Sequence, residues 1–325
     1  MRVVDNMQEQ IQVTVLCITY NHGPYIRNTL EHFVNQQVNF TYEILIHDDA
    51  STDDTADIIR EYAEKYPGVF VPILQTENQY SQGVPIMARI YPKARGKYVA
   101  ICEGDDYWPD LNKLQKQFDF LEAHPEYSGV AGMTEFFDDD GNTTRPQMPS
   151  AAYAGKELTE WTFLNEPGGN VASNTLMVRS SVVQDPCFIR ANEDSPKVGD
   201  ILLMLKTFED GKLYIMPDVF QFHRDQSREG ASNYNAIFDW KQKFSHCVTV
   251  LNVVEDHFRK SHDLLKWFEE NLLAAYIAAG RKKEKQAFFE VYRQIPKRYQ
   301  ISPCWLWIRR FPKRVAIKLR HVVGK

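Results

Sequence analysis

The sequence predicts an α/β protein in which a mainly parallel sheet is flanked by helices and followed by a C-terminal helical extension. Two observations lead to this prediction. Apolar runs of strand length recur in the first hundred residues, and apolar side chains at helical spacing follow the first two runs. From residue 236 onward the pattern is helical throughout. Alternating strands and helices favour parallel pairing, because each helix carries the chain back across the sheet.

The first strand is expected at residues 13–18 and stops at a polar turn, after which a helix begins. The second strand, residues 43–46, stops at the acidic segment 47–54, which offers a capped start for a helix that reaches about residue 66. The later elements are predicted in the same way. They are strands at 69–75, 98–102, 175–178 and 212–216, helices at 111–123 and 200–209, and a polar loop at 138–150.

Composition excludes several classes of protein. A chain of 325 residues with 43% hydrophobic residues can bury a full core. No apolar run approaches the roughly 18 residues that span a bilayer, and the first ten residues lack the apolar core of a signal peptide. The five cysteines are far apart, as expected for reduced thiols. We therefore predict a cytoplasmic protein with one large domain, residues 1–230, and a helical extension, residues 231–325.

Charge is distributed unevenly along the chain. Residues 291–325 contain ten Lys or Arg and no acidic residue, so the first 290 residues carry a formal charge of −15. An acidic body argues against nucleic acid as a partner. Trp305, Trp307 and a basic amphipathic segment that ends at Lys325 predict docking of residues 305–325 on an anionic membrane surface. The alternative is a solvated basic helix packed on the acidic body.

Polar residues gather where three of the predicted strands end. Ligands of parallel sheets collect beyond the carboxyl ends of the strands. Neither the G-x-G-x-x-G fingerprint nor the P-loop motif follows any of these strands. Asp105 and Asp106 come directly after the fourth strand, where adjacent carboxylates either bind a divalent cation, Mn²⁺ or Mg²⁺, or cap a turn and face water.

Three segments in this order resemble the successive blocks of the family 2 glycosyltransferases with the GT-A fold. They are TVLCITYN at residues 14–21, EILIHDDASTDDT at 43–55 and GKYVAICEGDDYW at 96–108. The resemblance covers roughly residues 11–230 and implies a Rossmann-like, mainly parallel sheet. It also implies inverting, metal-dependent transfer of a sugar from a nucleotide sugar, most often a UDP-sugar. The acceptor would be a saccharide or a lipid-linked saccharide in bacterial surface polysaccharide biosynthesis.

The resemblance assigns nucleotide-binding roles to the first two blocks. Thr19, Tyr20 and Asn21 would wrap the uridine, with Tyr20 stacking on the base, unless Tyr20 is only an aromatic at the edge of the core. Asp49 would contact the imide N–H of uracil. Asp48 matches this position less well and would instead cap the turn.

The third block resembles the variant DxD element of the family. Asp105 would then face the ribose, and Asp106 would bind the metal that bridges the diphosphate. Arg89 and Arg95 precede this block and either assist the diphosphate or stay solvated.

Later residues complete the predicted site. The segment VGDILLMLKTFEDGK at 198–212 resembles a later acidic block of the family, which makes Asp200 the expected catalytic base. Glu193 and Asp194 compete for this role, and Asp200 would otherwise be only a helix N-terminal residue favoured by the dipole. His223 and Arg224 stand where many relatives have an Arg-x-His segment, so they either contact the diphosphate or serve the fold.

Two tryptophans offer apolar surface for a sugar ring. Trp108 and Trp161 are the candidates, although burial in the core is the usual fate of a tryptophan.

Two rival functions remain at this level. A nucleotidyltransferase would share the acidic metal site but should carry a Gly-rich basic loop after the first strand. A noncatalytic module that binds sugar nucleotides or glycans would keep Tyr20 and Asp49 without needing Asp200.

Overall fold

The computed structural model describes residues 10–138, 140–225, 239–259 and 264–300. These residues fall into two compact units. The first unit contains the described residues up to 225 together with 257–259, and the second contains 239–256 and 264–300. The predicted boundary near residue 230 lies outside the described residues, as does the basic segment 305–325.

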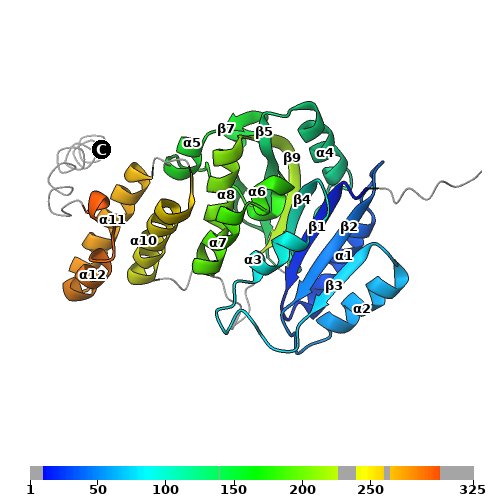
Figure 1. The fold of residues 1–325 in the computed structure, drawn as a ribbon, viewed down its shortest axis with the longest axis horizontal. Helices are drawn as coiled ribbons and strands as arrows, with labels where there is room; N and C mark the ends of the chain where they lie inside the picture. The colour runs from blue at the N-terminus through cyan, green and yellow to red at the C-terminus, as the bar shows by residue number, and fades with distance from the viewer. Residues whose placement is uncertain (1–9, 139, 226–238, 260–263, 301–325) are drawn as a thin grey trace, which may run out of the picture. The chain divides into compact units, whose positions relative to one another are not determined.

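The nine described strands form one mixed sheet in the order β3-β2-β1-β4-β8-β5-β9-β7, with β6 paired to β5 (Figure 1). β1 to β4 run parallel to one another, and β5 runs parallel to β9. The strands are β1 (Val13–Thr19), β2 (Tyr42–Asp48), β3 (Phe70–Leu74), β4 (Tyr98–Glu103), β5 (Tyr127–Phe137), β6 (Thr143–Met148), β7 (Lys156–Leu158), β8 (Met177–Arg179) and β9 (Lys212–Arg224).

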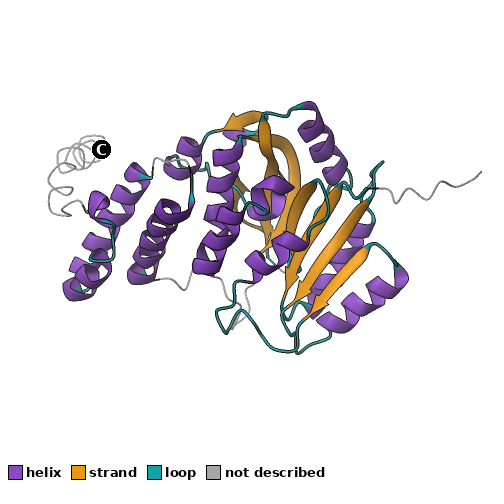
Figure 2. Cartoon of the chain, in the orientation of Figure 1, coloured by secondary structure: helices purple, strands orange, loops and turns teal. Residues whose placement is uncertain are grey.

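Helices cover the sheet of the first unit (Figure 2). Leu30, Phe33 and Tyr62 of α1 and α2 pack on strand residues such as Val15 and Ile44, and all five side chains are almost fully buried. This apolar face explains why the predicted helical spacing is realised. The helices of this unit are α1 (Gly23–Val34), α2 (Thr55–Lys65), α3 (Ile86–Ile90), α4 (Lys113–Ala123), α5 (Glu160–Asn165), α6 (Ser180–Val183), α7 (Pro186–Asp194) and α8 (Gly199–Asp210).

The second unit is helical, and α10 (Trp240–His257), α11 (Leu265–Arg281) and α12 (Lys285–Tyr292) form it. Phe244 and Phe288 stack with their ring centroids 5.2 Å apart, and Phe268 is also fully buried. Among the described residues, no helix is both long enough and apolar enough to cross a bilayer.

Several predicted elements differ from the structure. The polar loop expected at 138–150 is wrong, because Thr143–Met148 forms β6. The strand expected at 212–216 continues to Arg224, and β5 and β7 were not predicted. β6 is a largely exposed strand that pairs with β5, so its sequence carries no apolar face to signal it.

Trp108 is a core residue, which corrects its assignment as a sugar contact. Its side chain is fully buried, and its ring packs against Phe33 at a centroid distance of 4.8 Å. The indole N–H donates to the carbonyl of Asn174 at 2.9 Å. The ammonium of Lys113 lies 3.8 Å from the ring centroid, and burial lowers the pKa of this lysine to about 7. No surface of Trp108 is left for a ligand.

Candidate functional site

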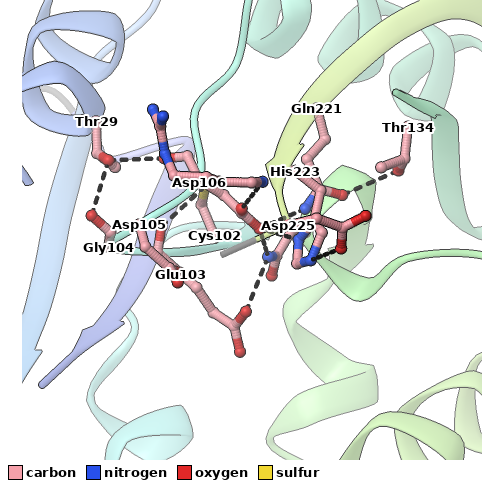
Figure 3. Close-up of polar contacts among 12 residues, drawn as sticks. Thr29, Cys102, Glu103, Gly104, Asp105, Asp106, Thr134, Gln221, His223 and Asp225 are labelled. Atoms are coloured by element: carbon pink, nitrogen blue, oxygen red, sulfur yellow. Dashed lines mark hydrogen bonds and ion pairs between the residues drawn. The ribbon is translucent and has the colours of Figure 1, made fainter. Parts of the chain in front are cut away.

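An acidic cluster lies at the carboxyl end of β4. One carboxylate oxygen from each of Glu103, Asp105 and Asp106 lies within 4.8 Å of the others (Figure 3). The turn between them is tight, because a Cβ on Gly104 would approach the hydroxyl of Thr19 to 2.7 Å. The sequence therefore places glycine where the fourth strand bends sharply into its acidic loop.

Asp106 is fully buried and accepts hydrogen bonds from residues far along the chain. Its Oδ2 accepts from the amide groups of Asn174 at 2.6 Å and Gln221 at 2.5 Å. The hydroxyl of Thr134 on β5 donates to the amide oxygen of Gln221 at 2.9 Å, which fixes the direction in which that amide faces. Asp106 is thus held in one orientation by contacts from β5, β9 and the segment before β8 (Figure 3).

His223 and Arg224 at the end of β9 both reach Asp106. The Nδ1 of His223 lies 3.1 Å from Asp106 Oδ2, and its Nε2 lies 3.8 Å from Asp225. Burial opposes protonation of His223, but the bond to Asp106 and the neighbouring carboxylates raise its pKa overall. Arg224 donates its backbone N–H to Asp106 at 3.3 Å, and its guanidinium lies over the ring of Tyr25 at 4.7 Å.

Burial and repulsion among the carboxylates of the cluster favour binding of a positive charge. Burial raises the pKa of Glu103 to about 8, and the charges of Asp105, Asp106 and Asp200 add to the effect. Burial also raises the pKa of Asp105, although His22, whose Nε2 lies 3.8 Å away, opposes the shift. Carboxylates this close are stabilised when a cation joins them.

The residues fit a hard divalent cation. Mn²⁺ and Mg²⁺ take oxygen ligands, and three carboxylates supply them here. The side-chain oxygen of Asn174 is buried beside the cluster and has no hydrogen-bond partner among the described residues. It is a further neutral oxygen ligand or acceptor at the same place.

Asp200 is a further carboxylate whose charge acts on the cluster. It lies in the first turn of α8 and is exposed, yet the protein packed around it raises its pKa, while a hydrogen bond with Ser173 opposes this. Its charge acts on both Glu103 and Tyr91. A solvent-accessible carboxylate with a raised pKa beside an acidic cluster is suited to accept a proton.

The two competitors of Asp200 lie elsewhere. Asp194 binds the imidazole of His257 at 2.6 Å. Glu193 lines a separate pocket together with Arg89. Arg95 pairs with the buried Glu43 near the amino ends of the strands, so it cannot assist a diphosphate at their carboxyl ends.

Trp161 lies in the first turn of the short helix α5. It is 42% exposed on α5, whose Phe163 packs on Phe208 with a centroid distance of 5.8 Å. Phe208 lies in the last turn of α8, two turns beyond Asp200. The ring of Trp161 is open at the surface, and its role as a platform for a sugar stays a prediction.

The loop after β1 is fastened to the loop after β2. The backbone N–H of Asn21 donates to the hydroxyl of Ser51, and the side-chain oxygen of Asn21 accepts from the N–H of Thr52, both at 2.8 Å. Asn21 has φ 55°, a left-handed conformation that favours Asn over most side chains. Next to it, Tyr20 is 42% exposed, so its ring is open to a ligand.

The two adjacent aspartates at the end of β2, Asp48 and Asp49, have different structural roles. Asp48 accepts from the N–H of Ser51 at 3.1 Å and so caps the turn. Asp49 is 3% exposed, and its two oxygens accept from the backbone N–H groups of Gln79 and Tyr80 at 2.8 and 2.9 Å. Each carboxylate oxygen has a second lone pair for a further donor.

Sequence reasoning missed four residues of this site. Glu103 directly follows the strand predicted at 98–102 and precedes the glycine, so a local signal was available. His22 and Gln221 lie in segments that were singled out for their neighbours. Asn174 had no local signal, because only the folded chain brings it to Asp106.

Comparison with known proteins matches the part of the chain that contains the segments 14–21, 43–55 and 96–108. A family model described as glycosyl transferase family 2 matches residues 14–185, more than half of the chain. The chain belongs to glycosyltransferase family 2. In the solved structures, Staphylococcus aureus TarS 1-349 in complex with UDP-GlcNAc aligns with a TM-score of 0.64 at 15% identity, over 97% of this chain and 93% of that chain. The family 2 chain therefore has the GT-A fold that its sequence predicts.

Two curated relatives match parts of this family 2 chain. The uncharacterized protein Rv1520 of Mycobacterium tuberculosis is 47% identical over 115 residues, which are 35% of this chain and 32% of that protein. The Escherichia coli protein WfaP, named as a UDP-Glc:α-D-GlcNAc-diphosphoundecaprenol β-1,3-glucosyltransferase, is 33% identical over 112 residues, 34% of this chain and 41% of WfaP. The chain thus aligns with about a third of the length of its mycobacterial relatives.

Proposed function

We propose that the protein is an inverting, metal-dependent glycosyltransferase that moves a sugar from a UDP-sugar to a saccharide or lipid-linked acceptor. One observation carries the proposal. In a chain with the GT-A fold, Asp200 approaches an acidic cluster at the carboxyl end of a parallel strand. The name of WfaP pairs a UDP-sugar with a lipid diphosphate acceptor, which supports bacterial surface polysaccharide biosynthesis as the setting.

Glu103, Asp105 and Asp106 are the residues that would hold Mn²⁺ or Mg²⁺. A divalent cation bound there would offset the negative charge that develops on the leaving diphosphate. Asp106 contributes a carboxylate whose position is fixed before substrate arrives, because Asn174 and Gln221 already hold it. Such preorganisation is the main way in which a protein lowers the barrier of a charge-separating step.

Inversion requires that the acceptor hydroxyl attack the anomeric carbon from the face opposite to the diphosphate. As the new C–O bond forms and the bond to the diphosphate breaks, the hydroxyl proton must leave. Asp200 is the base in this proposal, because it is accessible to an acceptor and its pKa is raised. His223 and Arg224 both contact Asp106 and would bind the diphosphate in this proposal.

The direct test is an assay of sugar release and transfer from UDP-sugars with and without Mn²⁺. A glycosyltransferase releases UDP with its sugar transferred to an acceptor, or to water when the acceptor is missing. A nucleotidyltransferase would instead transfer the uridylyl group of the UDP-sugar and release the sugar 1-phosphate. Binding of UDP-sugars with no turnover in either case would favour a noncatalytic module.

Uridine recognition by Thr19, Tyr20, Asn21 and Asp49 predicts a preference for UDP over GDP. Stacking of a base on an aromatic ring contributes about 1–3 kcal/mol, so Tyr20→Ala should weaken UDP binding by roughly 10- to 100-fold. Tyr20→Phe keeps the ring and should bind nearly as well as the wild type. Isothermal calorimetry measures the affinity of the wild type and of both variants for UDP and GDP. Equal affinity for GDP and UDP would contradict this assignment.

For the basic segment 305–325 we propose reversible attachment to the cytoplasmic face of an anionic membrane, where a lipid-linked acceptor would lie. Each Lys or Arg near such a surface contributes about 1 kcal/mol, so high salt should release the protein. Full-length protein should float with anionic liposomes at low salt, whereas a chain truncated before Trp305 should not. Equal flotation of the truncated chain would show that these residues are not the anchor.

A further inference from the structure

A pocket of about 540 Å³ in the first unit shares no residue with the acidic cluster. β2, the end of β3, the α3 region and α7 line it. Its polar lining consists of His47, Gln75, Gln79, Arg89, Lys93 and Glu193. Its volume lies within the range of small-molecule sites. None of these side chains takes part in the reaction proposed above.

The pocket faces the same side of the sheet as the catalytic residues. Ile18 on β1 is in register with His47 on β2 and with Glu103 on β4, so all three side chains point to one face. Two strand spacings separate His47 from Glu103, or about 10 Å between their backbones. A molecule seated in the pocket can therefore extend toward Glu103. The charge of Asp200 acts on Tyr91, which lies between the pocket residues Ile90 and Pro92, so Asp200 is also near this end of the pocket.

The pocket lining carries two cationic side chains, Arg89 and Lys93, and one anionic side chain, Glu193. Within the described part of the chain, the side chains of Arg89 and Lys93 make neither a hydrogen bond nor an ion pair, and both residues are exposed. Glu193 on the pocket wall offsets only one of the two charges. This net positive charge stands out on a chain whose first 290 residues carry a formal charge of −15. An anionic group is the ligand that such a pair attracts.

Hydrogen bonds fix the orientation of three side chains that line the pocket. Gln79 donates its amide N–H to the side-chain oxygen of Gln75 at 2.8 Å, and the amide nitrogen of Gln75 lies 3.2 Å from Nε2 of His47. This order makes Nε2 of His47 the acceptor, so Nδ1 carries the proton. Burial lowers the pKa of His47, which keeps the ring neutral. No other described residue accepts a hydrogen bond from Nδ1.

From this combination we infer that the pocket is an acceptor subsite for a saccharide unit that bears an anionic group, either a carboxylate or a phosphate. The guanidinium of Arg89 and the ammonium of Lys93 bind the anion, and the side-chain amides of Gln75 and Gln79 bind ring hydroxyls. Ile73 and Ile90 supply apolar surface for the C–H face of the ring. This inference rests on the proposed function, because it assumes that the acceptor is a saccharide.

Binding of monosaccharide probes to the full-length protein tests the inference without requiring turnover. Ligand-observed NMR compares glucuronate, glucose 6-phosphate and glucose in the presence of saturating UDP. The two anionic sugars should bind at least 10-fold more tightly than glucose, since hydrogen bonds to charged groups are the stronger class. Whichever anionic sugar binds more tightly identifies the anion as a carboxylate or a phosphate.

Arg89→Gln should weaken binding of the anionic sugars by about 10- to 100-fold and leave UDP affinity unchanged. Arg60→Gln, which removes an exposed arginine paired with Asp57 on α2, is the matched control and should change neither. The same titrations without UDP complete the test: sugar binding that is lost when UDP is added would place the pocket in the donor site and overturn the inference. Equal affinity for glucose, no detectable binding, or no effect of Arg89→Gln would overturn it too. Failure of UDP itself to bind would instead count against the proposed function.

Discussion

Asp200→Asn should lower kcat for sugar transfer by about 10²- to 10⁴-fold while leaving the affinity for UDP nearly unchanged. The reason is positional. Asp200 stands at the start of α8 rather than on the β4 turn that carries the acidic cluster, so as the proposed base it would act on the acceptor hydroxyl and not on the donor. Rapid-quench or steady-state assays with a UDP-sugar measure kcat, and calorimetry measures UDP affinity.

The pH profile gives a second readout of the same residue. A base works only when it is deprotonated, and the surrounding protein raises the pKa of Asp200. Activity of the wild type should therefore fall as the pH drops through this raised pKa, and the residual activity of Asp200→Asn should lack that acidic limb.

Two neighbouring acidic residues provide matched controls for Asp200. Glu193→Gln and Asp194→Asn remove carboxylates that the structure places in the separate pocket and against His257. Both variants should keep kcat for a neutral acceptor within a few-fold of the wild type. If Asp200→Asn instead loses UDP binding, Asp200 belongs to the donor site, and a base must be sought elsewhere.

The parts of the fold that the sequence predicts are those with local signals. β1, β2 and β4 are apolar runs buried on both faces, and each ends at a polar turn. β5 was missed because Gly129 and Gly132 interrupt its apolar pattern. A Cβ on Gly132 would approach the ring of Phe220 to 2.3 Å, so the glycine is required by contact with β9. Such a requirement is set by a distant strand and leaves no mark in the local pattern.

The candidate site likewise contains residues with a local sequence signal and residues that only the fold brings together. Asp105, Asp106 and Asp200 lie in recognisable segments, whereas the groups that orient Asp106 come from elements without any signature. Thr134 lies 28 residues beyond Asp106 along the chain and acts through Gln221, which lies 115 residues beyond it. The sequence identifies the carboxylates that are candidates for binding a metal or accepting a proton. Only the folded chain shows which neutral side chains fix their direction.

Asp106→Asn should lower transfer by at least about 10³-fold, because charge stabilisation by a metal site is worth several kcal/mol and each 1.36 kcal/mol is tenfold in rate. The amide would also turn an N–H group toward donors that now bind the carboxylate, the side chains of Asn174 and Gln221. The increase in UDP affinity on addition of Mn²⁺ should disappear in this variant. Calorimetric titration with UDP, with and without Mn²⁺, measures that difference.

Two further variants separate loss of the site from loss of the fold. Asp110→Asn removes a carboxylate four residues along that pairs with Lys116, and it should keep both transfer and the effect of Mn²⁺. Asp105→Asn changes a partly exposed member of the cluster, so it should fold normally and still lose most of the Mn²⁺ effect. Thermal unfolding establishes that each variant is folded. Near wild-type turnover in a folded Asp106→Asn protein would remove Asp106 from the metal site, since a carboxylate that binds the cation cannot be replaced by a neutral amide at so small a cost.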